Sequence, residues 1–171
     1  MTWIQTFSGK QFWPLEPKPE DVHIEDIAHS LSMRCRFNGH CIAFYSIAQH
    51  SVLVSKLTPK RLAVWGLLHD AGEAYLPDMP RPIKQFISGF NEIENRIMMA
   101  IAEALRLPWP MPEEINQADE IALATEARDL MVHPPKEWNI KSKPISSVVI
   151  PLSPEYAKKE FMNRYHELID H

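Results

Sequence analysis

The consecutive pair His69-Asp70 is the feature of this sequence whose residue types point most directly to chemistry. Glu73 follows His69 by four residues and Asp70 by three, a spacing that places the three ionisable side chains close together on a helix. The segment from Ala63 to Leu68 that precedes them is apolar. Ionisable groups in apolar surroundings need partners, and a divalent cation suits imidazole and carboxylate together. The pattern therefore predicts a metal site on this helix.

Two further residues are candidates to complete such a site. His50 lies between apolar Ile47 and Val54 on an earlier predicted helix, and it reaches His69 if the two helices pack antiparallel. Asp119 lies on a later predicted helix and supplies a second carboxylate. Two histidines and two carboxylates, with water in the remaining positions, make a credible hydrolytic metal site.

A structural alternative stays open for the histidine-aspartate pair. The dipeptide is common by chance, and a histidine on a buried helix face is often bonded only to a backbone carbonyl. Taken alone, His69 favours that interpretation over metal binding. The metal hypothesis depends on the four residues being considered together.

The ordered set His50, His69-Asp70 and Asp119 resembles the H…HD…D signature of the HD-domain metal-dependent phosphohydrolases. More narrowly, the chain is similar to the YfbR/YfdR-type branch of small bacterial, prophage and phage nucleotide phosphohydrolases. The similarity covers most of the chain and is carried by the runs 26–32, 35–40, 44–50, 69–75, 78–84, 118–119 and 124–130.

The resemblance implies one divalent metal ion (Mn, Co, Fe, Ni, Zn or Mg) on those four positions. It also implies catalytic roles for Glu73 and Asp78, which match a glutamate and a loop aspartate of the family. Glu73 is expected to orient or deprotonate the attacking water. Asp78 is expected to share that role or to protonate the leaving group, if burial keeps its pKa high.

Four residues are candidates for substrate binding: Arg36, Phe37, His40 and Lys84. Arg36 offers bidentate donors to phosphate and Lys84 a point charge, while Phe37 and His40 would line the sugar or base pocket. Deoxynucleotidase relatives have an Arg-Trp pair where this chain has Arg36-Phe37, which leaves deoxyribose selectivity open. Structural alternatives remain: Phe37 as a core aromatic, His40 as a turn residue and Lys84 as a solvated side chain.

The resemblance implies hydrolysis of nucleotides, deoxynucleotides above all, at the 5′ phosphorus with release of the nucleoside. A monophosphate substrate would yield inorganic phosphate, and a triphosphate substrate, as for a dATPase, would yield tripolyphosphate. Two alternatives remain: a non-catalytic nucleotide or metal sensor, and an HD phosphodiesterase acting on cyclic or hyperphosphorylated nucleotides.

The elements that must position these residues are mainly helical, and the resemblance implies the HD-domain helical bundle. A hairpin is expected around Ser8-Gly9, and a small β element is completed by the apolar run 148–150. On the helix predicted over 113–131, we interpret Glu126, Arg128 and Asp129 as a structural ion pair. The helices are predicted over 26–31, from Ser46 to Leu57, from a Thr58 cap through Leu62 toward Tyr75, over 91–105, over 113–131, and from Ser153 onward.

Composition limits the class of protein. The 171 residues are 45% hydrophobic and 23% charged, which is typical of one soluble globular domain spanning 1–171. A net charge of −4 gives no support to binding of a nucleic-acid polymer. Cys35 and Cys41 are expected to be free thiols, and with no apolar run long enough for a membrane, a cytoplasmic location is expected. By resemblance, the protein is expected to be a homo-oligomer.

Overall fold

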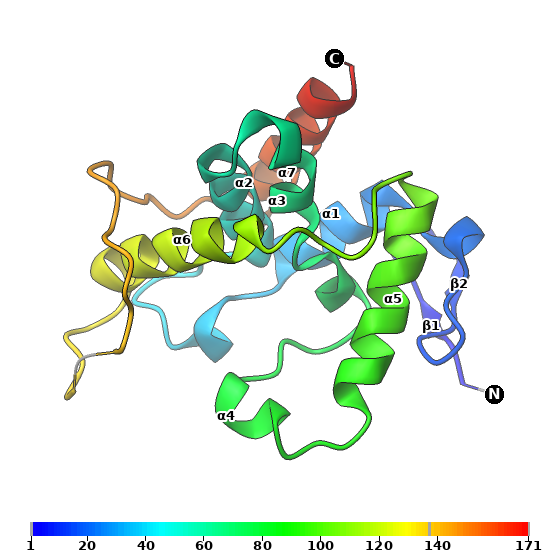
Figure 1. Ribbon diagram of the computed structural model, residues 1–171, viewed down its shortest axis with the longest axis horizontal. Coiled ribbons are helices and arrows are strands. Elements are labelled where there is room, and N and C mark those ends of the chain that lie inside the picture. The colour runs from blue at the N-terminus through cyan, green and yellow to red at the C-terminus, as the bar shows by residue number, and fades with distance from the viewer. Residues whose placement is uncertain (1, 137, 171) are drawn as a thin grey trace.

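A computed structural model describes residues 2–136 and 138–170 as a mainly helical fold, as the sequence predicts (Figure 1). The short segments are β1 (Ile4–Gln5), β2 (Gln11–Phe12), and the 3₁₀ turns η1 (Pro19–Asp21), η2 (Phe37–Gly39), η3 (Lys60–Leu62) and η4 (Ala71–Ala74). The α-helices are α1 (Ile24–Met33), α2 (Ile47–Leu57), α3 (Ala63–Leu68), α4 (Arg81–Lys84), α5 (Phe90–Ala104), α6 (Glu114–Leu130) and α7 (Pro154–Ile169).

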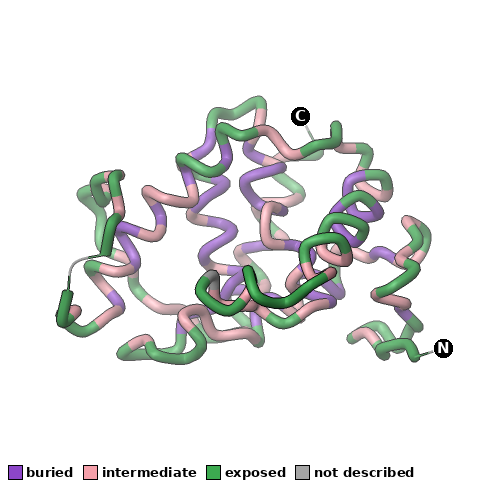
Figure 2. The backbone as a smooth tube through the Cα atoms, turned by 60° about the horizontal axis from the view of Figure 1, so that its bottom comes forward, coloured by how far each residue is buried: buried purple, intermediate pink, exposed green. Residues whose placement is uncertain are grey.

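The core forms where α2 packs against α3, α6 and α7. Figure 2 shows the buried residues concentrated in the central part of the molecule. The large side chains of Trp65, Leu67, Ile101 and Phe161 are almost entirely buried there. Burial of such apolar surface is the main favourable contribution to folding, so the residues carried by α2 and α3 stand on the most rigid part of the fold.

Ser46 and Thr58 mark the two ends of α2. The Ser46 hydroxyl accepts a hydrogen bond from the Gln49 backbone N–H at 3.1 Å and caps the beginning of the helix. Thr58 was expected to cap the start of the next helix, but its hydroxyl instead donates to the Val54 carbonyl at 2.8 Å and ends α2. A Cβ at Gly66 would lie 2.5 Å from the Thr58 hydroxyl, so glycine is needed for α2 and α3 to approach this closely.

The helix predicted to run on to Tyr75 is interrupted at the histidine-aspartate pair, which corrects the sequence expectation. Helix α3 ends at Leu68, Asp70 has φ −101° and ψ 15°, and the chain resumes as the 3₁₀ turn η4. Successive residues of an α-helix point about 100° apart. The backbone leaves the helix where these two consecutive side chains approach each other, with Nε2 of His69 3.1 Å from Oδ2 of Asp70.

The predicted N-terminal hairpin is present, with strands of two residues each. Ile4 pairs with Phe12 in an antiparallel register around the Ser8-Gly9 turn. The ring of fully buried Phe12 stacks on Tyr75, with ring centroids 3.8 Å apart. The hairpin is thereby held against η4, immediately after the histidine-aspartate pair.

The prediction of a β element at 148–150 is wrong, because the described residues of this segment form no strand. Val148 and Ile150 are 68% and 73% exposed, so their alternation with Val149 does not reflect a buried face. Side chains take the place of a neighbouring strand: Asp129 accepts from the Val149 N–H at 2.8 Å, and the Gln49 amide donates to the Ile150 carbonyl at 2.7 Å. Two backbone polar groups of this segment are therefore bonded to side chains.

The other helix predictions are confirmed to within a few residues at each end, including the Ser153 cap of α7. Among the residues that the structure describes, no helix combines the length and apolar character that crossing a bilayer requires.

Candidate metal centre

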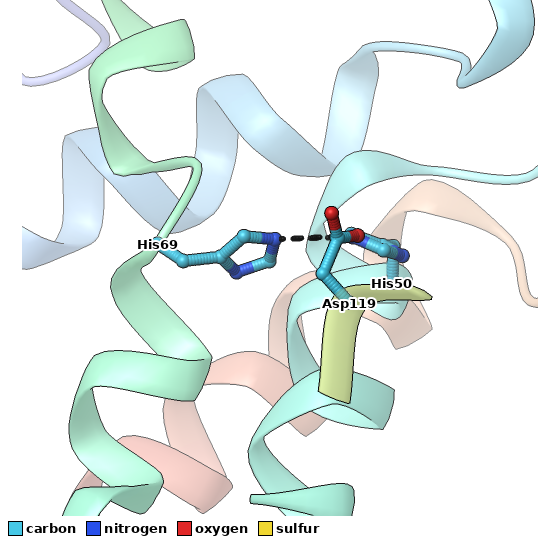
Figure 3. Close-up of side chains that lie close together, drawn as sticks. All are labelled: His50, His69 and Asp119. Carbon is cyan, nitrogen blue, oxygen red and sulfur yellow. Dashed lines mark hydrogen bonds and ion pairs between the residues drawn. The ribbon is translucent and has the colours of Figure 1, made fainter. Parts of the chain in front are cut away.

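Four predicted ligands, His50, His69, Asp70 and Asp119, come together between α2, the end of α3 and α6. The Nε2 atom of His50 lies 3.2 Å from Nε2 of His69 and 3.2 Å from Oδ1 of Asp119. The Oδ2 atom of Asp70 lies 3.1 Å from Nε2 of His69 and 3.6 Å from Nε2 of His50. Figure 3 shows the His69 ring pointing toward the side chains of His50 and Asp119. We call these four residues the ligand group.

Each of the two imidazoles is also held through its Nδ1 atom by a partner outside the ligand group. The Nδ1 atom of His69 lies 2.9 Å from the Gly66 carbonyl, which can only accept, so Nδ1 carries the proton and the Nε2 lone pair faces the ligand group. The Nδ1 atom of His50 lies 2.6 Å from Oε1 of the buried Glu126 carboxylate and donates to it. Both histidines therefore direct Nε2 inward, which is the arrangement of metal-binding histidines held by a second partner.

The donor set fits a divalent cation. Ligand atoms of His50, His69 and Asp119 all lie within 4.8 Å of one another and could hold a metal ion. Two imidazole nitrogen atoms that face each other 3.2 Å apart next to carboxylates require a proton or a cation between them. Imidazole with carboxylate suits Mn, Fe, Co, Ni and Zn, so this chemistry selects a class of ions and not one metal.

The charges around the ligand group are strongly coupled. Burial and Arg36 act to lower the pKa of His50, but Glu126 and Asp119 outweigh them and raise it to about 9. Burial acts to raise the pKa of Asp70, and the neighbouring histidines and Arg36 nevertheless bring it well below its ordinary value. The pKa of Asp119 is also lowered, because its contacts with His50 and His69 outweigh burial. Both carboxylates are therefore ionised and ready to bind a cation.

A cavity of 220 Å³ adjoins the ligand group, and we call it the site cavity. His69, Asp70 and Glu73 line it, together with Lys84, Met98 and Trp109. Burial and the carboxylates of Asp70 and Asp78 raise the pKa of Glu73 to about 9, and its Oε2 atom is buried without a hydrogen-bond partner among the residues that the structure describes. A carboxyl group that keeps its proton at neutral pH beside ligand-type residues has a perturbed pKa of the kind found in proton-transfer residues.

Arg36 lies directly beside the ligand group. Its Nη1 atom is 3.5 Å from Oδ2 of Asp70, and its Nε atom donates to Oε2 of Glu126 at 3.2 Å. Burial acts to lower the pKa of this guanidinium, but the surrounding carboxylates Glu126, Asp70 and Asp119 raise it above the ordinary value. A fixed positive charge therefore stands next to the position where an anion would meet the ligand group.

The other predicted substrate residues differ in where they lie. Lys84 lines the site cavity, where its Nζ atom is 2.5 Å from a carboxylate oxygen of Glu94. Phe37 is half-buried in the turn after Arg36, with its ring centroid 6.0 Å from that of Trp138, and it does not line the site cavity. His40 is exposed at the end of the same turn, and no contact found among the described residues brings its side chain to the ligand group.

Comparison with known proteins places this chain in a family. Over 98% of the chain and 96% of the relative, it is 43% identical to YfdR, an uncharacterised protein of Escherichia coli strain K12. The chain belongs to the YfdR family. An uncharacterised protein of Rhodobacter capsulatus is 37% identical over 74% of this chain and 69% of its own length.

Similarity beyond the YfdR family extends to proteins named as enzymes. A 5′-deoxynucleotidase of Photobacterium profundum is 29% identical over 63% of this chain and 50% of its own length. The chain thus spans about half the length of that enzyme. No model of a protein family matches the chain.

Glu126 is the important residue of this YfdR-family site that sequence reasoning placed incorrectly. Arg128 and Asp129 do form the expected ion pair, with Nε of Arg128 2.7 Å from Oδ1 of Asp129. Glu126 takes no part in that pair and is fully buried. It accepts from His50, from Arg36 and from the Tyr45 hydroxyl at 2.9 Å. Its separation of seven residues from Asp119 was the available signal, because residues two helical turns apart share a face.

Proposed function

We propose that this protein is a divalent-metal-dependent phosphohydrolase that acts on nucleotides at the phosphorus bonded to the 5′ oxygen and releases the nucleoside. The observation that carries the proposal is the convergence of the four ligand-group residues beside Arg36 and the site cavity. Ligands for a cation, a positive charge for an anion and a perturbed carboxyl group are the three components that hydrolysis of a phosphate ester requires.

The name of a relative supports the substrate class. The match to a 5′-deoxynucleotidase covers 63% of this chain, and nucleotide 5′-phosphohydrolase activity is the coarse function that it supports. We infer the HD-type H…HD…D arrangement from the ligand group itself. We also propose that residues 1–171 form a single domain and that the protein is a homo-oligomer located in the cytoplasm. Light scattering of the purified protein tests the assembly, and cell fractionation tests the location.

Each residue has a distinct role in this proposal. When bound, a divalent cation lowers the pKa of water and polarises phosphoryl oxygens. His50, His69, Asp70 and Asp119 would hold the cation. Arg36 would bind the phosphoryl group through its planar donors, since the guanidinium is already fixed by two carboxylates.

Proton handling is assigned to the two carboxyl groups of the segment that follows the ligand pair. Glu73 would orient the attacking water or take its proton, because it lines the same cavity as His69 and Asp70. Positive charge added at the ligand group would favour its ionised form, which is the form needed to accept a proton. Asp78, which acts electrostatically on Glu73, would share this role or protonate the leaving 5′ oxygen.

The test is a panel of deoxynucleoside and ribonucleoside mono- and triphosphates, each incubated with purified protein and Mn, Co, Fe, Ni, Zn or Mg ions. Chromatography of the products should show the nucleoside together with either inorganic phosphate or tripolyphosphate. The Asp119→Asn variant should be inactive in the same preparation. Release of pyrophosphate, or loss of the γ-phosphate alone, would contradict the proposal.

A further inference from the structure

The site cavity receives residues from four segments of the chain, one of which is α4 with Lys84. The ligand-type residues come from the end of α3 and from η4, and Met98 comes from α5. Trp109 and Met111 come from the connection between α5 and α6. One and the same cavity therefore combines charged groups suited to a phosphoryl group with a large aromatic side chain and two thioethers.

Trp109 packs on the core through Trp65 and is partly exposed. Its ring centroid lies 6.2 Å from that of Trp65 at an interplanar angle of 49°. Trp65 is only 2% exposed and belongs to the core, whereas Trp109 is 39% exposed. A ring anchored against a rigid neighbour offers its free surface to a ligand at little cost in conformational entropy.

Phe37, the aromatic residue first expected to contact the sugar or base, does not line the site cavity. Its ring lies near Trp138 and within 5.4 Å of the Arg36 guanidinium carbon. Apart from the His69 ring, Trp109 is the aromatic side chain among the described residues that line the site cavity.

We propose that Trp109 is the platform on which the nucleobase of the substrate stacks, an inference that rests on the nucleotide phosphohydrolase activity proposed above. Nucleobases have flat π faces, and tryptophan stacks on every base with little dependence on its identity. Met98 and Met111 add adaptable apolar contacts around the ring. The Asn95 amide, which also lines the site cavity, offers a donor and an acceptor to the edge of a base.

The experiment compares a substrate that has a base with one that has none. The ratio of kcat/KM for deoxyadenosine 5′-monophosphate to kcat/KM for 2-deoxyribose 5-phosphate is measured, or for the corresponding triphosphates if the panel selects those. In Trp109→Leu this ratio should fall about 5- to 100-fold, because the stacking surface is lost while the reacting end of the substrate is unchanged. In Trp109→Phe it should stay within about threefold of the original value.

A matched control is Trp138→Leu, which removes a second partly exposed tryptophan, 41% exposed and not part of the site cavity. The control should leave the ratio unchanged. If Trp109→Leu does not fold, Trp109→Met serves the same comparison, because its flexible side chain fills irregular gaps.

Two results overturn the inference: an unchanged ratio in Trp109→Leu, or an equal loss for both substrates, which would indicate a role in maintaining the cavity. Failure of the proposed function is recognised separately. In that case the unaltered protein would hydrolyse neither substrate with any of the metals, and the ratio would have no value to compare.

Discussion

The ligand group and the adjoining site cavity hold carboxyl groups in opposite electrostatic states. Asp70 and Asp119 face two imidazoles, and both have pKa values below the ordinary range despite their burial. Glu73 lies only three residues beyond Asp70, yet burial and neighbouring negative charge raise its pKa to about 9. The difference shows that the surroundings, and not the residue type, decide which carboxylate can bind a cation and which can carry a proton.

Removal of a ligand-group side chain tests whether the ionised carboxylates and the histidines hold a cation. This change should have the largest effect on activity. We expect His69→Ala to lower kcat/KM by at least about 1,000-fold, because the charge stabilisation supplied by a cation is lost with it. Elemental analysis of the purified variant should show the bound metal lost in parallel. The control His133→Ala changes an exposed histidine after α6 and should keep both metal and activity. Full activity without metal in His69→Ala would contradict the assignment.

Glu126→Gln should weaken the ligand group without removing a ligand. We expect metal affinity to fall about 10- to 100-fold, since the residue that orients His50 is no longer an anion. Titration calorimetry with Mn or Co measures the change. Glu114→Gln on the same helix is the matched control, because Glu114 pairs with Arg61 at 3.1 Å on the surface. Equal metal affinities of the two variants would show that Glu126 does not position His50.

Stability as a function of pH tests whether Glu73 holds a proton in the folded protein. The pKa of Glu73 is raised in the folded protein from 4.5 to about 9, so its contribution to stability is complete below about pH 4.5 and is lost as the pH rises through 9. In the presence of a chelator, Glu73→Gln should therefore gain stability relative to the unaltered protein as the pH is raised. We expect a gain of about 1 kcal/mol or more at pH 9 and almost none at pH 5.

Urea unfolding of the two proteins at several pH values measures this difference. Parallel stability curves for Glu73→Gln and the unaltered protein would show that Glu73 does not hold its proton in the folded state.

The smallest effect is expected where an ion pair is exposed. Glu114→Gln breaks the pair with Arg61, whose side chains are 52% and 68% exposed, and should leave the melting temperature unchanged. Arg36→Met breaks the buried contacts with Asp70 and Glu126 and should lower the melting temperature, because two carboxylates lose their positive neighbour. Equal melting temperatures in the two variants would contradict the contrast between buried and exposed charge.

Much of the fold could be predicted from local sequence signals. Ser46 and Ser153 cap helices where they were expected to, because an N-cap depends on a hydroxyl and on the few backbone groups next to it. The helices α5 and α6 follow the period of their apolar residues, since one side of each faces the core. The candidates for the ligand group were also available from the sequence, as a pattern of residue types in order.

Tertiary structure decided what depends on a partner distant in the chain. The run 148–150 has strand-like residues, but no strand among the described residues pairs with it, and the side chains of Gln49 and Asp129 bond to its backbone instead. Glu126 looks like one more surface charge in the sequence, and only the packing of α2 against α6 places it on His50. The helix predicted to run through His69 ends at Leu68, where the consecutive side chains of His69 and Asp70 meet. Helix periodicity and capping are local properties that a sequence displays, whereas burial, pKa and the meeting of ligands depend on which segments the fold brings together.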